Sequence, residues 1–186
     1  FDRQLGALPI RFNAASGDLE SLADLTQKLR QSGGERVYTS GMPLPEQAEA
    51  SFPFPADLPG VTTTPQIWLG QARKNRLLCK LHCDIFTSLF AQVWGNKTVH
   101  LYPPQHHQYL YPMASFSGYQ PCLVDPLAPD LTRHPEFGRA LHLKVEIRPG
   151  DVLVIPSGWY YCLGAEDPTL SVSRGLPLEV AHQLAQ

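Results

Sequence analysis

The spacing of hydrophobic residues changes character part-way along the chain. Between residues 18 and 32, leucines recur every three or four positions, which is the spacing of one face of a helix. These leucines are Leu19, Leu22, Leu25 and Leu29. Two consecutive glycines at positions 33 and 34 follow, and glycine commonly ends a helix. The pattern therefore predicts one amphipathic helix over residues 18–32.

From residue 66 onward, the apolar residues instead form short runs that are rich in β-branched and aromatic side chains. Glycine, proline and asparagine separate these runs, as expected for strands joined by tight turns. The predicted strands lie within residues 65–71, 76–84, 88–95, 97–104, 140–151, 152–158, 159–164 and 169–175. No helices alternate with them, so the pattern predicts an antiparallel sandwich or barrel rather than a parallel α/β sheet.

The segments outside this strand-rich region carry weaker signals. Residues 35–41 resemble a further short strand, whereas residues 41–64 are rich in proline and show no regular spacing. A second helix is predicted to begin within residues 177–186. We therefore expect one domain in three parts, with a helix and proline-rich lead-in over residues 1–65, a β core over residues 66–176, and the start of a C-terminal helix.

Composition narrows the classes of function. The 186 residues are 43% hydrophobic and 17% charged, which suits one globular domain with a full core. The formal net charge is −2 without a basic run, so neither nucleic acid nor an anionic membrane is expected as a partner. No apolar run is long enough to span a bilayer. The four cysteines form no zinc or disulfide pattern, which favours reduced thiols and a cytoplasmic location.

The first chemical signal is the pair His82 and Asp84. Residues two apart on a strand point to the same face, so both side chains can reach one ion. An imidazole nitrogen and a carboxylate oxygen supply two of the three ligands in the facial triad of non-haem iron enzymes. This spacing is common by chance, so a surface histidine beside an aspartate is the alternative interpretation.

Lys97 is the second chemical signal. It follows a tight turn and shares one face of its predicted strand with Val99 and Leu101. If that face is turned inward, the ammonium group is buried and needs an anion as its partner. If the alternation runs the other way, Lys97 faces solvent, and the pattern alone does not choose between the two.

Longer blocks of sequence carry a resemblance to a known family. The blocks are LRQSGGERVYTSGMPL, LHCD, FAQVWGNKTVHLYPP, YLYP and VDPLAPDLTRHPEFGRALHLKVEIRPGDVLVIPSGWYYCLG, and the likeness spans about residues 18–175. In order and spacing they resemble the JmjC/cupin-like 2-oxoglutarate oxygenases, most of all the asparaginyl hydroxylase group that inhibits hypoxia-inducible factor. The resemblance implies a double-stranded β-helix, a jelly roll of two packed sheets with the site between them.

The resemblance also implies roles for individual residues. By position, His82 and Asp84 correspond to the first two iron ligands of the family. Lys97 and Tyr38 correspond to a lysine and a tyrosine that hold the far carboxylate of the cosubstrate. The implied cofactors are therefore Fe(II) and 2-oxoglutarate, and bound 2-oxoglutarate would be the anion that a buried Lys97 needs.

The sequence departs from the family at several positions around this implied site. Tyr161 stands where the family has its second iron-ligating histidine. Cys79 replaces a threonine, while Ser88 and Ser173 replace two asparagines. These changes alter one implied metal ligand and reduce the hydrogen-bonding capacity around the implied cosubstrate.

Three roles for Tyr161 stay open. It ligates iron as a phenolate, it leaves His82 and Asp84 to hold the metal with water, or it marks a site that binds no metal. The first two roles imply an oxygenase that hydroxylates a protein side chain or a small molecule. The third implies a non-catalytic jelly-roll binding module. A cupin isomerase or sugar-binding protein is a weaker third class, and the substrate and oligomeric state stay undetermined.

Overall fold

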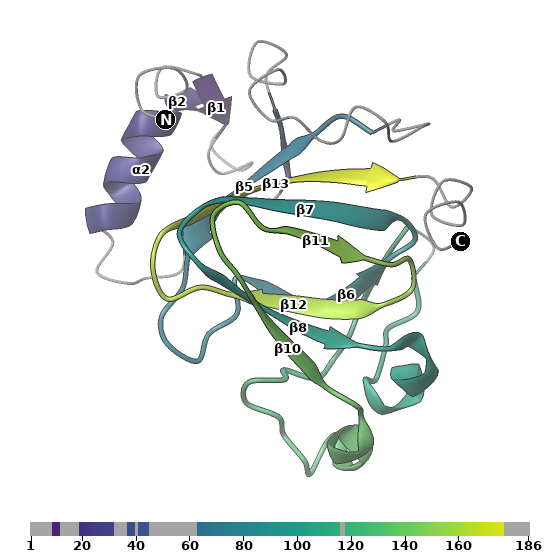
Figure 1. The fold of residues 1–186 in the computed structure, drawn as a ribbon. Coiled ribbons are helices and arrows are strands. Elements are labelled where there is room, and N and C mark those ends of the chain that lie inside the picture. The colour runs from purple at the N-terminus through teal and green to yellow at the C-terminus, as the bar shows by residue number, and fades with distance from the viewer. Residues whose placement is uncertain are drawn as a thin grey trace.

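The computed structural model describes residues 9–11, 19–31, 37–39, 41–44, 63–115 and 118–176 (Figure 1). The secondary structure is dominated by short strands. In chain order the elements are β1 (Pro9–Arg11), β2 (Leu19–Ser21), α2 (Leu22–Gln31), β3 (Val37–Tyr38), β4 (Met42–Pro43), β5 (Gln66–Gln71), β6 (Cys79–Asp84), β7 (Thr87–Trp94), β8 (Lys97–Tyr102), the 3₁₀ helix η1 (Pro104–Tyr109), β9 (Tyr119–Pro121), the 3₁₀ helix η2 (Pro135–Arg139), β10 (Leu143–Ile147), β11 (Val152–Ile155), β12 (Tyr160–Gly164) and β13 (Thr169–Leu176).

Two antiparallel sheets form the body of the fold. One has the strand order β10-β8-β12-β6-β9, and the other has the order β11-β7-β13-β5-β3, with β4 also paired to β5. Strands β1 and β2 pair separately. The prediction of a mainly β, cupin-like jelly roll with an N-terminal helix is therefore confirmed (Figure 1).

The main core lies between the two sheets. On β8, alternate residues Lys97, Val99 and Leu101 are buried and point inward, as one of the two predicted phases requires. Val99 and Leu101 pack in one hydrophobic cluster with Phe90 of β7 and Ile155 of β11, which belong to the opposite sheet. The candidate site described below opens into this same interlayer space.

A second cluster covers the outer face of the six-stranded sheet. Leu29 of α2 packs there with Ile67 and Leu69 of β5 and with Leu170 and Val172 of β13. Strand β5 is therefore covered on both faces, which agrees with its nearly continuous burial. Across the described part of the chain, no helix is long and apolar enough to cross a membrane.

The helix begins later than the sequence predicts. It starts at Leu22 rather than at residue 18, because residues 19–21 form β2 and pair with β1. Leucine spacing cannot reveal this, since the pairing partner lies in a separate three-residue strand.

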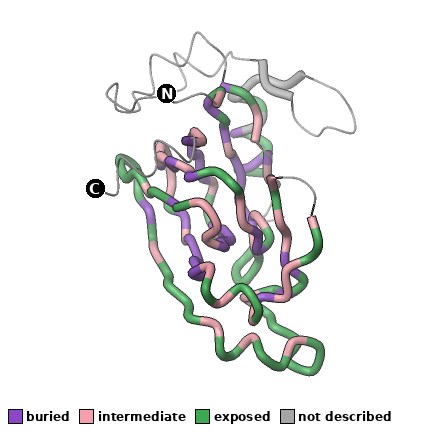
Figure 2. The backbone as a smooth tube through the Cα atoms, turned by 90° about the vertical axis from the view of Figure 1, so that its right-hand side faces the viewer, coloured by how far each residue is buried: buried purple, intermediate pink, exposed green. Residues whose placement is uncertain are grey.

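Figure 2 shows that the connection through residues 125–142, at the lower end of the fold, is mostly exposed.

The sequence pattern also missed short strands. Strand β4 falls within residues 41–64, which the pattern describes as irregular, and it pairs with β5. Strand β9 pairs with β6 and completes one edge of the five-stranded sheet. Strands of two or three residues are too short to show an alternating pattern. The helix predicted within residues 177–186 lies outside the described residues.

The turn between β7 and β8 determines where Lys97 enters its strand. Gly95 has a φ of +67°, a conformation that glycine adopts without strain. A side chain at this position would strike the backbone carbonyl of Pro168. The buried Gln92 amide donates hydrogen bonds to the carbonyl oxygens of Trp94 and Gly95, at 2.8 and 2.7 Å. These contacts hold the turn and place Lys97 as the first residue of β8.

Candidate functional site

A cavity of about 1090 Å³ opens between the two sheets. Its wall includes all but one of the site residues that the sequence predicted, namely Tyr38, Cys79, His82, Asp84, Ser88, Tyr161 and Ser173. The exception is Lys97, which lies behind the wall. The fold therefore brings the predicted set together from strands of both sheets.

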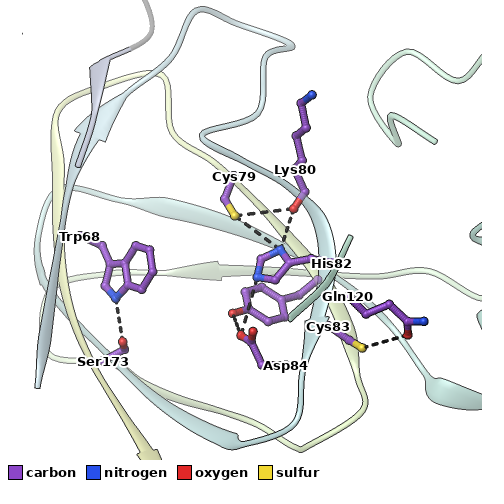
Figure 3. Close-up of polar contacts among 9 residues, drawn as sticks. Trp68, Cys79, Lys80, His82, Cys83, Asp84, Gln120 and Ser173 are labelled. Carbon is purple, nitrogen blue, oxygen red and sulfur yellow. Dashed lines mark hydrogen bonds and ion pairs between the residues drawn. The ribbon is translucent and has the colours of Figure 1, made fainter. Parts of the chain in front are cut away.

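His82 and Asp84 project from β6 into this cavity (Figure 3). The Nδ1–H of His82 donates a hydrogen bond of 2.7 Å to the carbonyl oxygen of Lys80. The other ring nitrogen, Nε2, faces Asp84 Oδ2 at 3.7 Å. Because a carbonyl oxygen can only accept, a neutral His82 carries its proton on Nδ1 and turns the Nε2 lone pair toward Asp84.

Tyr161 completes the cluster from the neighbouring strand β12. Its backbone is the register partner of His82, and its ring centroid lies 4.3 Å from that of His82. The Tyr161 hydroxyl donates a hydrogen bond of 2.6 Å to Asp84 Oδ2. Burial and the neighbouring Asp84 carboxylate raise the pKa of Tyr161 well above its ordinary value. In the metal-free protein, Tyr161 is therefore a neutral phenol that binds Asp84.

His82 and Asp84 form a charge pair in the metal-free protein. Burial lowers the pKa of His82, but hydrogen bonding to Asp84 and Cys79 outweighs burial and raises this pKa to about 10. Burial likewise raises the pKa of Asp84, but the interaction with His82 and the hydrogen bond from Tyr161 outweigh it, so the Asp84 pKa is lowered. A metal ion bound to Nε2 would have to displace the proton that His82 holds there.

Lys97 lies in a buried polar chain behind the cavity. The side chain is 0% exposed, and Nζ donates a hydrogen bond of 2.7 Å to Ser171 Oγ. Ser171 donates in turn to Gln92 Oε1 at 2.5 Å. The ammonium group also lies 4.9 Å from the ring centroid of Phe90, which lines the cavity. The sequence left open whether Lys97 points inward or toward solvent, and the structure shows that it points inward.

The charge of Lys97 is poorly compensated within the described residues. No carboxylate among them lies within ion-pair distance of Nζ. Burial lowers the pKa of Lys97 to about 7, and the nearby Cys79 opposes this shift only in part. A carboxylate placed beside Nζ would favour the ammonium form of Lys97, because an opposite charge raises the pKa of a base.

The remaining predicted residues surround the His82–Asp84 pair. Cys79 Sγ lies 3.5 Å from His82 Nδ1 (Figure 3). Ser173 accepts a hydrogen bond of 2.7 Å from Trp68 Nε1 (Figure 3). Trp68 stacks on Tyr38 with ring centroids 6.0 Å apart. The Ser173 hydroxyl, which stands where the family has an asparagine, therefore already accepts a hydrogen bond from the Trp68 indole.

Two residues outside the predicted set contribute to the site. Trp68 packs against the interlayer cluster, lines the cavity and donates a hydrogen bond to Ser173. Ser171, the hydrogen-bond partner of Lys97, was not considered. A signal for Ser171 exists, because it precedes Ser173 by two positions on β13 and therefore lies on the same face.

Three other histidines, His100, His106 and His142, lie away from the cavity. His100 and His142 bond to each other through Nδ1 and Nε2 at 2.8 Å, and neither lines the cavity. His106 accepts a hydrogen bond from the backbone N–H of Leu141. Cys162, next to Tyr161, packs in the cluster on the opposite face of its sheet. Besides the predicted cluster, the cavity lining includes the Asp125 carboxylate, whereas none of these histidines reaches it.

The side chains around the cavity offer few ligands for the iron that the resemblance implies. Within the described residues, no three His, Cys, Asp or Glu side chains are grouped to hold a metal ion. Two remain, a ring nitrogen and a carboxylate oxygen 3.7 Å apart. Ligands of one ion at metal–ligand distances of about 2.1 Å and a right angle lie roughly 3 Å apart. His82 and Asp84 therefore fit a metal as a two-residue pair after a small closure.

The fold and the site together define a cupin-like jelly roll whose cavity contains a histidine and an aspartate on one strand. The profile of the cupin-like domain family matches residues 10–174. Because the match covers most of the sequence, the chain belongs to this family.

Several characterised proteins are similar to parts of the chain. HSPB1-associated protein 1 of Bos taurus is 32% identical over 126 residues, which cover 63% of this chain and 24% of that protein. tRNA wybutosine-synthesizing protein 5 of Mus musculus is 28% identical over 86% of this chain and 45% of its own length. Lysine-specific demethylase 8 of Danio rerio is 39% identical over 46% of this chain and 21% of its own. The chain thus spans less than half of each relative.

Proposed function

We propose that this chain is the core of an Fe(II)- and 2-oxoglutarate-dependent oxygenase with a variant metal site, which hydroxylates a protein side chain or a small molecule. Membership of the cupin-like family supports an oxygenase-like function. The observation that carries the proposal is the combination of an inward-facing His82–Asp84 pair with a buried Lys97 that lacks a carboxylate. The finer likeness to the asparaginyl hydroxylase group is part of this proposal.

In the proposed enzyme, His82 and Asp84 would hold the metal. When bound, iron and 2-oxoglutarate would supply the activation of O₂ that hydroxylation needs. The carbonyl of Lys80 keeps the Nδ1 proton of His82 in place and so directs Nε2 into the cavity. The Tyr161 hydroxyl donates to Asp84 Oδ2, the oxygen that also faces His82 Nε2, so it orients the carboxylate but competes with a metal for this oxygen. Tyr161 would become a ligand itself only by losing its proton.

Lys97 and Tyr38 would bind the far carboxylate of the cosubstrate. Phe90 and Cys79 line the cavity and also lie close to the Lys97 ammonium group. Ser171 keeps Nζ from turning away, because its own proton is donated to Gln92 and its lone pairs are left to accept. The cosubstrate would thus extend from the His82–Asp84 pair toward Lys97, flanked by Cys79, Ser88 and Ser173.

A non-catalytic binding module is the second candidate, and a specific observation favours it. The contacts that a metal would need are already made within the protein, since Asp84 is bound by Tyr161 and faces a protonated His82. Such a module would keep the carboxylate-binding Lys97 without turnover. The two candidates therefore differ in whether the metal can displace these contacts.

An anaerobic titration with Fe(II) and 2-oxoglutarate, followed by visible absorption, separates the candidates. The proposed oxygenase gives a metal-to-ligand charge-transfer band in the wild-type protein, and the band weakens in Lys97→Met. Tyr161→His, which restores the histidine of the family, should strengthen it. A band in Tyr161→His alone would overturn the oxygenase proposal and support the binding module. Absence of the band from both proteins would argue against any iron site built on His82 and Asp84.

A further inference from the structure

Strand β10 ends the five-stranded sheet with an open edge. Within the described residues it pairs only with β8, and it forms the end of the strand order (Figure 1). Most of its residues are exposed, including Leu143, Lys144 and Glu146. Among the described residues, one row of its backbone N–H and C=O groups therefore has no strand as a partner. Such an edge is a template for pairing unless its side chains prevent it.

Exposed apolar side chains gather around this edge. Leu141 and Leu143 are 51% and 43% exposed, and Val152 and Val154 of the following strand β11 are 52% and 49% exposed. Strand β11 ends the other sheet. The hairpin from β10 to β11 thus presents large apolar side chains at the edges of both sheets. These apolar side chains would gain burial if a second strand covered the edge, and the charges on β10 then determine which register is favourable.

The charges on β10 are symmetric about its centre. Lys144 and Glu146 lie on the same face of the strand as their β8 partners His100 and Thr98, and they flank Val145. If a second β10 strand runs antiparallel with Val145 opposite Val145, each lysine faces the glutamate of the other copy. Opposite charges at directly paired positions stabilise an antiparallel pair.

Other registers are penalised by the same charges. Centring the pair on Lys144 places two lysines opposite each other, and centring it on Glu146 places two glutamates opposite each other. A shift by a single residue would turn the outer face of one copy toward the inner face of the other. Like charges in direct opposition destabilise a pair. The strand therefore selects one two-fold register with Val145 at its centre.

We infer that β10 is a self-association edge, which pairs antiparallel with β10 of a second copy of this chain and joins two five-stranded sheets into one continuous sheet. The inference rests on the edge, its exposed leucines and its charge pattern, and it is independent of the proposed oxygenase function. Glu146 also lies 3.5 Å from Arg148 of its own chain. In the dimer this carboxylate would sit between Arg148 and the incoming lysine, which both attract it.

The association is expected to be weak. Five residues per copy cover less than the roughly 800 Å² per partner of a standard stable interface. The dimer should therefore appear at about 100 µM rather than at about 1 µM. Burial of Leu141 and Leu143 at the ends of the paired strands would add to the backbone hydrogen bonds.

Sedimentation velocity over a range of protein concentrations tests the inference with charge-reversal variants. Lys144→Glu and Glu146→Lys each create two like-charge pairs in the dimer, so each should weaken self-association by roughly tenfold. A mixture of the two variants should associate again, because Lys144→Glu supplies only glutamates and Glu146→Lys only lysines at the paired positions. Labelling one variant with a fluorophore makes this mixed dimer visible by itself.

Matched controls separate the edge from net charge. Lys74→Glu and Glu166→Lys make the same charge changes at exposed positions away from β10 and should leave association unchanged. Thermal unfolding establishes that every variant is folded. A wild-type protein that stays monomeric at roughly 1 mM overturns the inference, and so does a dimer that both β10 variants leave intact. Failure of the mixed variants to associate would also contradict the proposed register.

Discussion

His82 and Lys97 are two buried basic side chains with different surroundings. They are 4% and 0% exposed. His82 faces Asp84, whose hydrogen bonding outweighs burial and raises the His82 pKa to about 10. Lys97 has the Ser171 hydroxyl and the Phe90 ring beside it, and burial lowers its pKa to about 7. Asp84 therefore keeps His82 protonated at neutral pH. Lys97 loses its proton near pH 7, because it has no such partner among the described residues.

The comparison shows that burial alone does not determine the charge of these groups. Removal from water lowers the pKa of any base, so the opposite outcomes come from the partners. Asp84 supplies a full negative charge, while Ser171 supplies only a dipole. The proposed binding of a cosubstrate carboxylate at Lys97 rests on this difference between the two bases.

The largest effect is expected from Asp84→Asn, which removes the charge partner of His82. Breaking a largely buried ion pair by removing one member costs about 3 kcal/mol. The His82 pKa is raised in the folded state, so this stabilisation is complete below pH 6.5 and is lost as the pH rises through about 10. The lowered Asp84 pKa means that it is also lost as the pH falls below 3.8.

Denaturant unfolding of the metal-free protein at pH 6 and pH 10 measures this effect. The difference between wild type and Asp84→Asn should be large at pH 6 and small at pH 10. Asp125→Asn is a suitable control, because Asp125 also lines the cavity but, among the described residues, forms no ion pair with a buried base. Equal stability of Asp84→Asn and wild type at pH 6 would contradict the pairing.

Lys97→Met should change stability in the opposite direction. Replacing a buried, uncompensated charge by an apolar side chain of similar length stabilises the empty protein by about 1–2 kcal/mol. The folded-state pKa of Lys97 is lowered from 10.5 to about 7, so its burial is costly below pH 7, and this cost disappears as the pH rises toward 10.5. The gain in Lys97→Met, measured by the same unfolding experiment, should shrink over that range. A destabilised Lys97→Met would mean that Lys97 is compensated after all.

The affinity for 2-oxoglutarate should depend on pH through the same group. A carboxylate binds the ammonium form, so affinity should fall roughly tenfold per pH unit above about pH 7, and a proton should be taken up on binding. Isothermal titration of the metal-loaded protein, in buffers of different ionisation enthalpy, measures both quantities. Lys97→Met should bind about 10–100-fold more weakly and lose this dependence. A wild-type affinity that is constant from pH 7 to 9 would exclude Lys97 as the anchor.

The smallest effect is expected from Tyr161→Phe, which removes one hydrogen bond to Asp84 and leaves the ring. The loss should cost about 1 kcal/mol and raise the Asp84 pKa toward its ordinary value of 3.8. NMR titration of the Asp84 carboxyl carbon measures the shift. Tyr160→Phe is the matched control, since the neighbouring Tyr160 hydroxyl donates to Gln120 instead. An unchanged Asp84 pKa in Tyr161→Phe would contradict the role given to this hydroxyl.

Much of the strand layout could be predicted because alternation and turn residues are local signals. The strands that carry His82, Lys97 and Tyr161 all appear where the pattern indicates them. The start of α2 and the strand β4 could not be predicted in this way. Each depends on pairing with a partner elsewhere in the chain, and a segment of two or three residues carries no periodicity of its own.

The sequence by itself determined that His82 and Asp84 share a face, because side chains two positions apart on a strand point to the same side. It also limited the Lys97 side chain to two directions, toward the core or toward solvent. Only the tertiary structure decided which direction holds, because that depends on which face of β8 meets the opposite sheet. It also decided that Tyr161 binds Asp84. These residues are 77 positions apart, and the pairing of β12 with β6 brings them within 2.6 Å.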